Sequence, residues 1–169
     1  MQATEQRGVR RYRPAETERM KELEGAELAS FQARAGALAV DFLLAAAIFM
    51  PAAFGLGLVA EKFFGFHNIH IELNLYENWY SILYLVVFFG LSTYFGNGQT
   101  LGKKALGIRV VSLVHHRMSL WHSIERALGY GASALELGFG FLQYFIHPNR
   151  RTVHDRMAET IVIRENKKV

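Results

Sequence analysis

One acidic residue, Asp41, stands inside a long apolar stretch of the chain. A carboxylate within a membrane span costs about 2.5–3.5 kcal/mol on insertion scales, so such a residue marks a functional site by default. Arg34 lies two helical turns earlier, so both side chains are expected on one helix face, about 10 Å apart along the axis. Arg34 would then lie at the membrane interface and reach toward Asp41. Two interpretations stay open, namely proton-coupled chemistry at Asp41 and a buried ion pair or hydrogen-bonded carboxylate that fixes helix packing.

A second acidic residue, Glu136, lies near the middle of a later, glycine-rich apolar block. A carboxyl group in apolar surroundings holds its proton more readily than one in water. Glu136 is therefore a candidate relay partner for Asp41, able to bind and release a proton. The alternative is that the helix breaks here and exposes Glu136 to the membrane interface.

Other motifs do not indicate nucleotide, metal or hydrolase chemistry. The stretch 98–104 (GQTLGKK) lacks the first glycine of a phosphate loop, and Lys104 stands where Ser or Thr would bind magnesium. We instead expect Lys103 and Lys104 to contact anionic lipid headgroups, at about 1 kcal/mol each. His67 and His70 are spaced for one helical face, but no third metal ligand stands nearby, and His154-Asp155 has no nucleophile motif near it. We therefore predict no enzymatic activity, no metal and no cofactor.

The hydropathy of the sequence divides the chain into a charged N-terminal segment and three apolar blocks. These segments must position the residues described above. The chain has 169 residues, of which 51% are hydrophobic and 20% charged, with a net charge of +4 and no cysteine. This composition excludes a disordered chain, a disulfide scaffold and an ordinary water-soluble domain. Residues 1–33 are predicted to form a charged cytoplasmic tail, partly disordered or helical. Residues 35–60 and 80–96 are predicted transmembrane helices, because about 20 apolar residues cross the hydrocarbon layer, and Pro51 should bend the first.

The third apolar block, residues 128–146, is too short to form two full spans. We favour a re-entrant or interfacial helical hairpin with both ends in the cytoplasm, and a plain third span is the competing prediction. Two short β-branched segments, 108–114 and 160–164, are predicted to pair, since a lone strand needs a partner. They can pair only on one side of the membrane, which favours the re-entrant block. The predicted fold is therefore an all-α membrane protein with two transmembrane helices, a third re-entrant or interfacial segment and a small cytoplasmic β-hairpin.

The distribution of basic residues predicts the orientation of the chain. Lys and Arg number seven up to Arg34, one within 61–79, five within 97–126 and six after 146. The positive-inside rule then places the N-terminus and residues 97–126 in the cytoplasm and residues 61–79 outside. The net positive charge suits anionic lipid headgroups. We predict a multi-pass protein of the cytoplasmic (inner) membrane, with the lipid bilayer and no nucleic acid among its partners.

Four motifs, in order along the chain, resemble the RDD family of membrane proteins, named for one Arg and two Asp. The segment 34–37 (RAGA) followed by Asp41 is similar to that family's first-helix pattern. Segments 99–104 (QTLGKK) and 107–111 (GIRVV) are similar to its central cytoplasmic motif, and Glu125-Arg126 to a pair before the third block. The C-terminal motif is matched by Arg150-Arg151, His154-Asp155 and 160–162 (TIV), which makes Asp155 the second Asp. Glu159 departs from the pattern, where a small residue, often Gly, precedes the Thr.

The resemblance implies a membrane domain over residues 34–164, followed by a short tail at 165–169. It implies one polar cluster of Arg34, Asp41 and Asp155, to which we add Glu136. It also implies a role in transport, since some members resemble cation/proton antiporters. We predict cation/proton or small-solute transport by a homo-oligomer, because two spans cannot enclose a pathway. The alternative is a non-catalytic accessory or scaffold subunit that binds another membrane protein.

Overall fold

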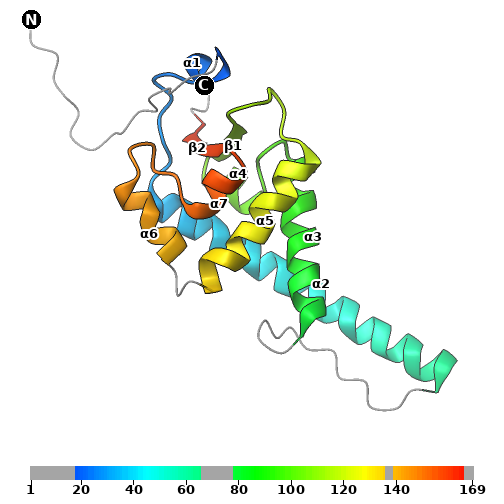
Figure 1. Ribbon diagram of the computed structural model, residues 1–169. Coiled ribbons are helices and arrows are strands. Elements are labelled where there is room, and N and C mark those ends of the chain that lie inside the picture. Colours follow the sequence, from blue (N-terminus) through cyan, green and yellow to red (C-terminus); the bar gives the residue numbers. More distant parts are fainter. Residues whose placement is uncertain (1–17, 66–77, 136–138, 166–169) are drawn as a thin grey trace, which may run out of the picture.

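The longest element of the computed structural model is helix α2 (Phe31–Phe64), and the structure describes residues 18–65, 78–135 and 139–165 (Figure 1). Ser30 caps its start by accepting from the backbone N–H of Ala33 at 3.2 Å, and Gly65 ends it in the left-handed region at φ 66°. Helix α2 has 34 residues and is about 50 Å long at 1.5 Å per residue, more than the hydrocarbon layer of about 30 Å. It contains the predicted span and is, in the described ranges, the one helix long and apolar enough to cross a membrane.

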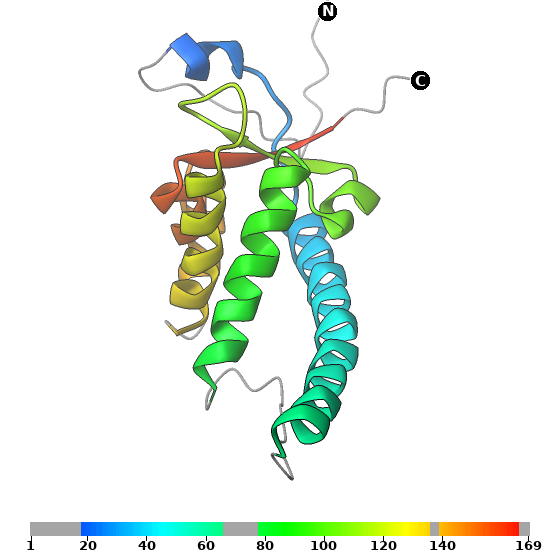
Figure 2. The same cartoon turned by 90° about the vertical axis from the view of Figure 1, so that its right-hand side faces the viewer.

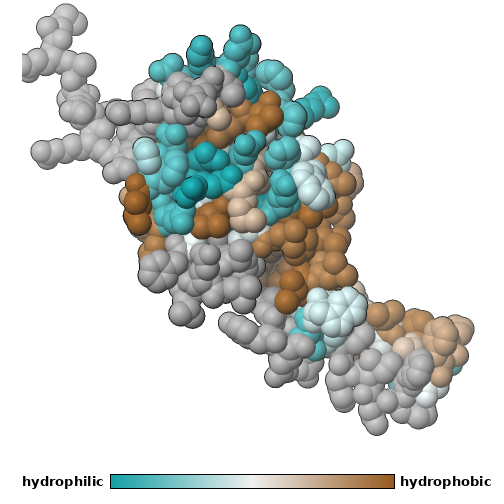
Figure 3. Space-filling model, in the orientation of Figure 1, coloured by the Kyte–Doolittle hydropathy of each residue, from teal (hydrophilic) through white to brown (hydrophobic). Residues whose placement is uncertain are grey.

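Helices α2 and α3 (Trp79–Phe95) present large apolar side chains on their surfaces. Figure 3 shows this apolar surface below a polar end of the molecule. The most exposed of these side chains include Leu43, Phe54, Phe63, Trp79 and Phe95. An apolar surface of this extent marks contact with a membrane or with another protein.

A two-stranded antiparallel sheet lies across one end of the helices (Figure 2). Strands β1 (Ile108–Ser112) and β2 (Thr160–Arg164) pair from Ile108 with Arg164 to Ser112 with Thr160, which confirms the predicted pairing. They do not form a hairpin, because helices α5 (Leu120–Leu135), α6 (Phe139–Ile146) and α7 (Val153–Met157) lie between them in the chain. We call the sheet, helix α4 (Leu101–Ala105) and α7 the platform; the short helix α1 (Glu18–Glu22) precedes it in the chain.

The third apolar block forms two helices, α5 and α6, and α5 packs along α3. Strand β1 precedes α5 and strand β2 follows α6. Because the two strands pair, both ends of the α5–α6 segment lie at the platform. A hairpin has this course, whereas a single through-running helix would separate the two strands. The break is predicted near residues 136–140; residues 136–138, and with them Glu136, fall outside the described residues, and residues 139–140 belong to α6.

Apolar side chains under the sheet join the platform to the start of α2. The backbone N–H of Ala29 donates to Val162 O at 2.9 Å, and Leu28 forms a bridge with Ile163. The buried cluster around these contacts consists of Ala29, Ala37, Ile108, Val110, Met118 and Val162. Glu159, between α7 and β2, has φ 45°, a left-handed conformation that glycine adopts more easily. The left-handed conformation explains why the family pattern has a small residue, often Gly, at this position.

Candidate functional site

Asp155 is a fully buried carboxylate near the start of helix α7. Thr152 caps this helix, and its backbone N–H donates to Asp155 Oδ2 at 3.2 Å in a capping box. Arg34 Nη1 from α2 donates to the same oxygen at 2.7 Å, and Arg126 Nη1 from α5 donates to Oδ1. One carboxylate thus joins three elements that lie far apart in the sequence.

The same guanidinium groups also hold strand β2. Arg126 Nη1 donates to Thr160 Oγ1 at 2.7 Å, and Arg34 Nη2 donates to Val162 O at 3.3 Å. A buried charge is tolerated only when paired and hydrogen-bonded, and these additional acceptors meet that requirement. The ion pairs therefore attach the first turns of α2 and α5 to the platform.

Asp41 is bound by the first turn of helix α4 and is also buried. Its Oδ1 accepts from the backbone N–H of Gly102 at 2.7 Å, and its Oδ2 accepts from the hydroxyl of Thr100. Lys103 Nζ lies 3.8 Å from Asp41 Oδ2 and donates to Thr100 Oγ1 at 3.2 Å. The arrangement suits a carboxylate, because the free backbone N–H groups at a helix start and a nearby ammonium both favour negative charge.

The structure places two of the expected contacts differently. Arg34 bonds Asp155 instead of reaching toward Asp41. Lys103 is only 5% exposed, so the expectation that it contacts lipid headgroups is wrong; its ammonium turns inward to Thr100 and Asp41. Lys104 is exposed, and its contact with lipid stays a prediction.

Electrostatics keep Asp155 ionised and His154 neutral. Burial opposes ionisation of Asp155, but Arg126 and Arg34 outweigh it and hold the pKa of that carboxyl far below its ordinary range. Burial lowers the pKa of His154 to about 3, against the opposing influence of Asp155 and with the help of the neighbouring cations. His154 Nε2 lies 2.8 Å from Thr152 Oγ1, and its ring packs against Tyr130 with centroids 4.4 Å apart. His154 is therefore a neutral, packed side chain at neutral pH.

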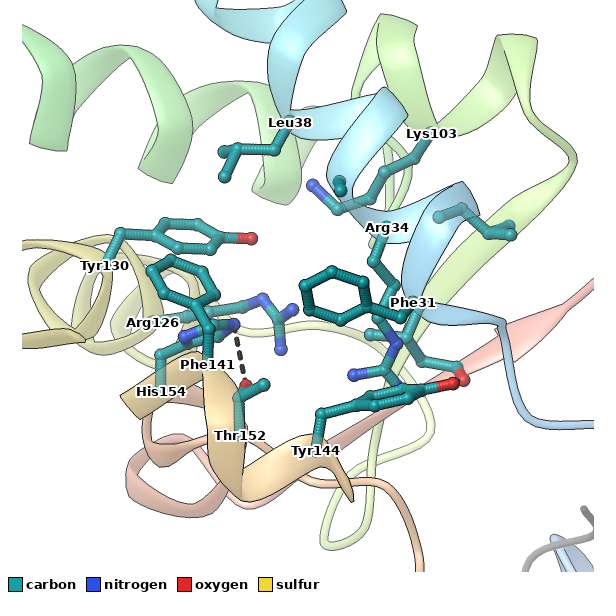
Figure 4. Close-up of a pocket in the computed structure, with 13 residues that line it drawn as sticks. Phe31, Arg34, Leu38, Lys103, Arg126, Tyr130, Phe141, Tyr144, Thr152 and His154 are labelled. Atoms are coloured by element: carbon teal, nitrogen blue, oxygen red, sulfur yellow. Dashed lines mark hydrogen bonds between the residues drawn. The ribbon is translucent and has the colours of Figure 1, made fainter. Parts of the chain in front are cut away.

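A cavity of about 230 Å³ lies between α2, α5, α6 and α7, and we call it the inter-helix cavity. Figure 4 shows Arg126 and Lys103 pointing toward this space and Leu38 entering it from α2. Three cationic side chains line the cavity, namely Arg34, Lys103 and Arg126. His154 and four aromatic rings line it as well: Phe31, Tyr130, Phe141 and Tyr144. It thus connects the surroundings of Asp41, through Lys103, with those of Asp155, through the two arginines.

Sequence reasoning singled out both carboxylates but missed most of their partners. Thr100 and Gly102 stood in a motif that was rejected as a phosphate loop and matched to the family pattern without a role for either residue, and Arg126 appeared only through the family resemblance. One signal was present: Thr152 three positions before Asp155 is the spacing of a capping box, which marks a helix start. Tyr130 and Tyr144, which line the cavity, carried no sequence signal that separates them from core aromatics.

Comparison with known families gives one match. A sequence model of the RDD family matches residues 28–159, which include Arg34, Asp41, Arg126 and Asp155. No curated protein and no solved structure matches the chain.

The approach of α4 to α2 requires glycine at position 102. A Cβ there would lie 2.3 Å from Ala37 O and 2.9 Å from Asp41 Oδ1, so the backbone would have to move. We expect Gly102→Ala to lower the free energy of unfolding in detergent by about 1–3 kcal/mol or more. Gly55→Ala in α2 is the matched control, because a Cβ there meets nothing within 4 Å. Equal melting temperatures for the two variants would contradict the docking of Asp41 on α4.

The low pKa of His154 predicts sensitivity to acid. Unfolded histidine titrates near pH 6.5, whereas the folded-state pKa is about 3, so the unfolded chain binds more protons between these values. Stability should therefore fall as the pH drops below about 6.5, and loss of the Asp155 contribution should follow below about pH 4.

We expect His154→Gln to flatten this decline between pH 6.5 and 4.5, measured as melting temperature against pH. His116→Gln, which removes a histidine whose side chain is 77% exposed, is the control. A decline that is equally steep in wild type and His154→Gln would show that another group causes it.

Proposed function

The chain belongs to the RDD family, and from that premise we propose that it binds a small solute in the inter-helix cavity and transports it as an oligomer in a membrane. The observation that supports this proposal is the cavity of about 230 Å³ with Arg34, Lys103 and Arg126 in its lining. Ligand sites are typically concave, apolar and furnished with a few convergent polar groups. The cavity has this composition.

The proposed membrane arrangement uses α2 and α3 as two spans, with α5 and α6 entering from the platform side and returning to it. The exposed apolar side chains of α2 and α3 support lipid contact. The basic residues concentrated before α2 and between α3 and α5 support a cytoplasmic platform and N-terminus in the inner membrane. Two spans do not enclose a pathway, so transport requires a homo-oligomer.

The solute version of transport has more support than cation/proton exchange at Asp41. Asp41 already accepts from Gly102 N–H and the Thr100 hydroxyl, and Asp155 faces two guanidinium groups. For Asp41 to exchange a proton for a cation, its bonds to α4 would have to open in each cycle. The proposed second carrier, Glu136, lies outside the described residues.

A second candidate function is that of a non-catalytic accessory subunit that binds another membrane protein. The engagement of both carboxylates by groups of the same chain supports it, since such ion pairs can fix one arrangement of helices. In this proposal the polar residues attach the platform to α2, and the exposed apolar faces contact the partner.

A flux assay in proteoliposomes separates these functions. Vesicles with a pH dye inside and an imposed pH gradient would receive Na⁺, K⁺ or Li⁺ salts, or sodium butylphosphonate as a small organic solute. Solute transport predicts a butylphosphonate response at least tenfold above protein-free vesicles. Leu38→Trp should abolish this response, because Leu38 lines the cavity, whereas Leu43→Trp, at a 71% exposed position of the same helix, should keep it.

Two results would contradict the proposal. A cation-dependent flux that Asp41→Asn abolishes and Leu38→Trp leaves intact would establish exchange at Asp41 instead. The absence of any flux from folded wild-type protein would overturn self-sufficient transport. Crosslinking for a membrane partner would then test the accessory role.

A further inference from the structure

We infer that the inter-helix cavity binds an oxyanion head group, of the phosphate or carboxylate type, that carries an apolar group. This ligand class rests on the proposed solute site and specifies its chemistry. It differs from the cation expected from the intramembrane carboxylates, because the groups that reach the cavity are mainly hydrogen-bond donors.

The charges around the cavity leave an excess of positive charge. Arg34, Lys103 and Arg126 line it, whereas the two nearby carboxylates, Asp41 and Asp155, form ion pairs with these cations and accept from backbone N–H groups. Three cationic side chains thus face two carboxylates, and His154 is neutral. In surroundings of low dielectric constant, an unbalanced positive charge attracts an anion more strongly than it would in water.

Two of these cations each have an N–H donor without an acceptor in the described part of the chain. The Nε atoms of Arg34 and Arg126 are buried, and no oxygen of the described residues accepts from them. The Arg126 side chain is 3% exposed and points into the cavity in Figure 4. Burying a donor without an acceptor is unfavourable, so an oxyanion placed between these groups would relieve that cost.

Lys103 completes the set of donors from the opposite side. Its ammonium donates to Thr100 Oγ1 at 3.2 Å, but it lies 3.8 Å from Asp41 Oδ2, too far for a good hydrogen bond. An ammonium has three N–H donors, so it can bond Thr100 and an anion at once. The cavity therefore offers donors from α2, α4 and α5.

The remaining lining indicates an apolar group beside the anionic head. The rings of Phe31, Phe141 and Tyr144 and the Leu38 side chain border the same space. Two guanidinium groups lie close to the Tyr144 ring, whose centroid is 5.1 Å from Arg34 Cζ and 5.3 Å from Arg150 Cζ. Aromatic rings pack well against alkyl chains. An inorganic anion without an alkyl chain would make no such contact with these rings.

The size of the cavity limits the ligand. Its volume of about 230 Å³ far exceeds the roughly 10–15 Å³ that one water needs and is below the roughly 300–1,000 Å³ of drug-sized sites. Phe31 and Ala35, both exposed, line it at the first turns of α2, so the cavity reaches the surface there. A head group with a few carbons fits, either as a soluble amphiphile or as the end of a membrane lipid.

Binding of hexyl phosphate to the full chain in phosphatidylcholine nanodiscs tests the inference by calorimetry, independently of transport. We expect saturable binding that exceeds that of inorganic phosphate and of hexylammonium by at least tenfold. Lys103→Gln should weaken it at least tenfold, whereas Lys62→Gln, the same change at the far end of α2, should not. Leu38→Trp should weaken it without any change of charge, and Leu43→Trp should not.

Each outcome of this experiment decides a separate point. Equal binding of hexylammonium, or equal loss in Lys62→Gln, would overturn the anion site, because attraction would then come from the tail or from general surface charge. If Lys103→Gln does not fold, Leu38→Trp decides: unchanged binding in that variant would overturn the cavity as the site. Nanodiscs with phosphatidylglycerol separate the two ligand sources, since competition supports a lipid head group and unchanged affinity a soluble amphiphile. Binding without flux in proteoliposomes would keep the ligand class and overturn transport.

Discussion

The carboxylate of Asp155 is the point through which the rest of the structure is connected. It is fully buried, it accepts from Arg34 of α2 and Arg126 of α5, and it caps its own helix through Thr152. Removing one partner of a buried ion pair leaves an uncompensated charge, which costs far more than the intact pair contributes. Because the same arginines also bond β2, the position of the sheet relative to the helices depends on this one carboxylate.

Asp41 likewise attaches part of the platform, helix α4, to helix α2. Like Asp155, it accepts a backbone N–H from the first turn of a short helix, and a threonine caps that helix. Each carboxylate therefore attaches one short platform helix, α4 or α7, to a long apolar helix. The inter-helix cavity lies between these two attachments, and Lys103 and the two arginines border it because they are held there by the carboxylates. The fold and the proposed ligand binding thus depend on the same charges.

The sequence predicted the elements better than the contacts. Strands 108–114 and 160–164 could be paired because a lone strand needs a partner, and the register from Ile108 to Ser112 bears this out. Asp41 stood out because a carboxylate is unfavourable in apolar surroundings, whereas Asp155 was singled out only by the family resemblance. The partner of Arg34 was wrong, since a shared helix face gives proximity along one helix but not the direction of a long side chain. Lys103 was expected at lipid headgroups because a basic pair near a span usually lies at the interface, whereas α4 packs so closely on α2 at Gly102 that the Lys103 ammonium lies beside Asp41.

The most direct test of whether Asp155 connects the helices to the platform is a double-mutant cycle on Asp155 and Arg126. The free energies of unfolding would be measured in detergent at neutral pH. Asp155→Asn and Arg126→Gln should each cost about 3–5 kcal/mol, because the first leaves the buried Arg126 charge unpaired and the second leaves Asp155 Oδ1 without its guanidinium. The double variant should lose far less than the sum of the two single losses, since it removes the pair as a unit. Additive losses would contradict the account, because they would mean that the two side chains contribute independently and that Asp155 does not connect the helices to the platform.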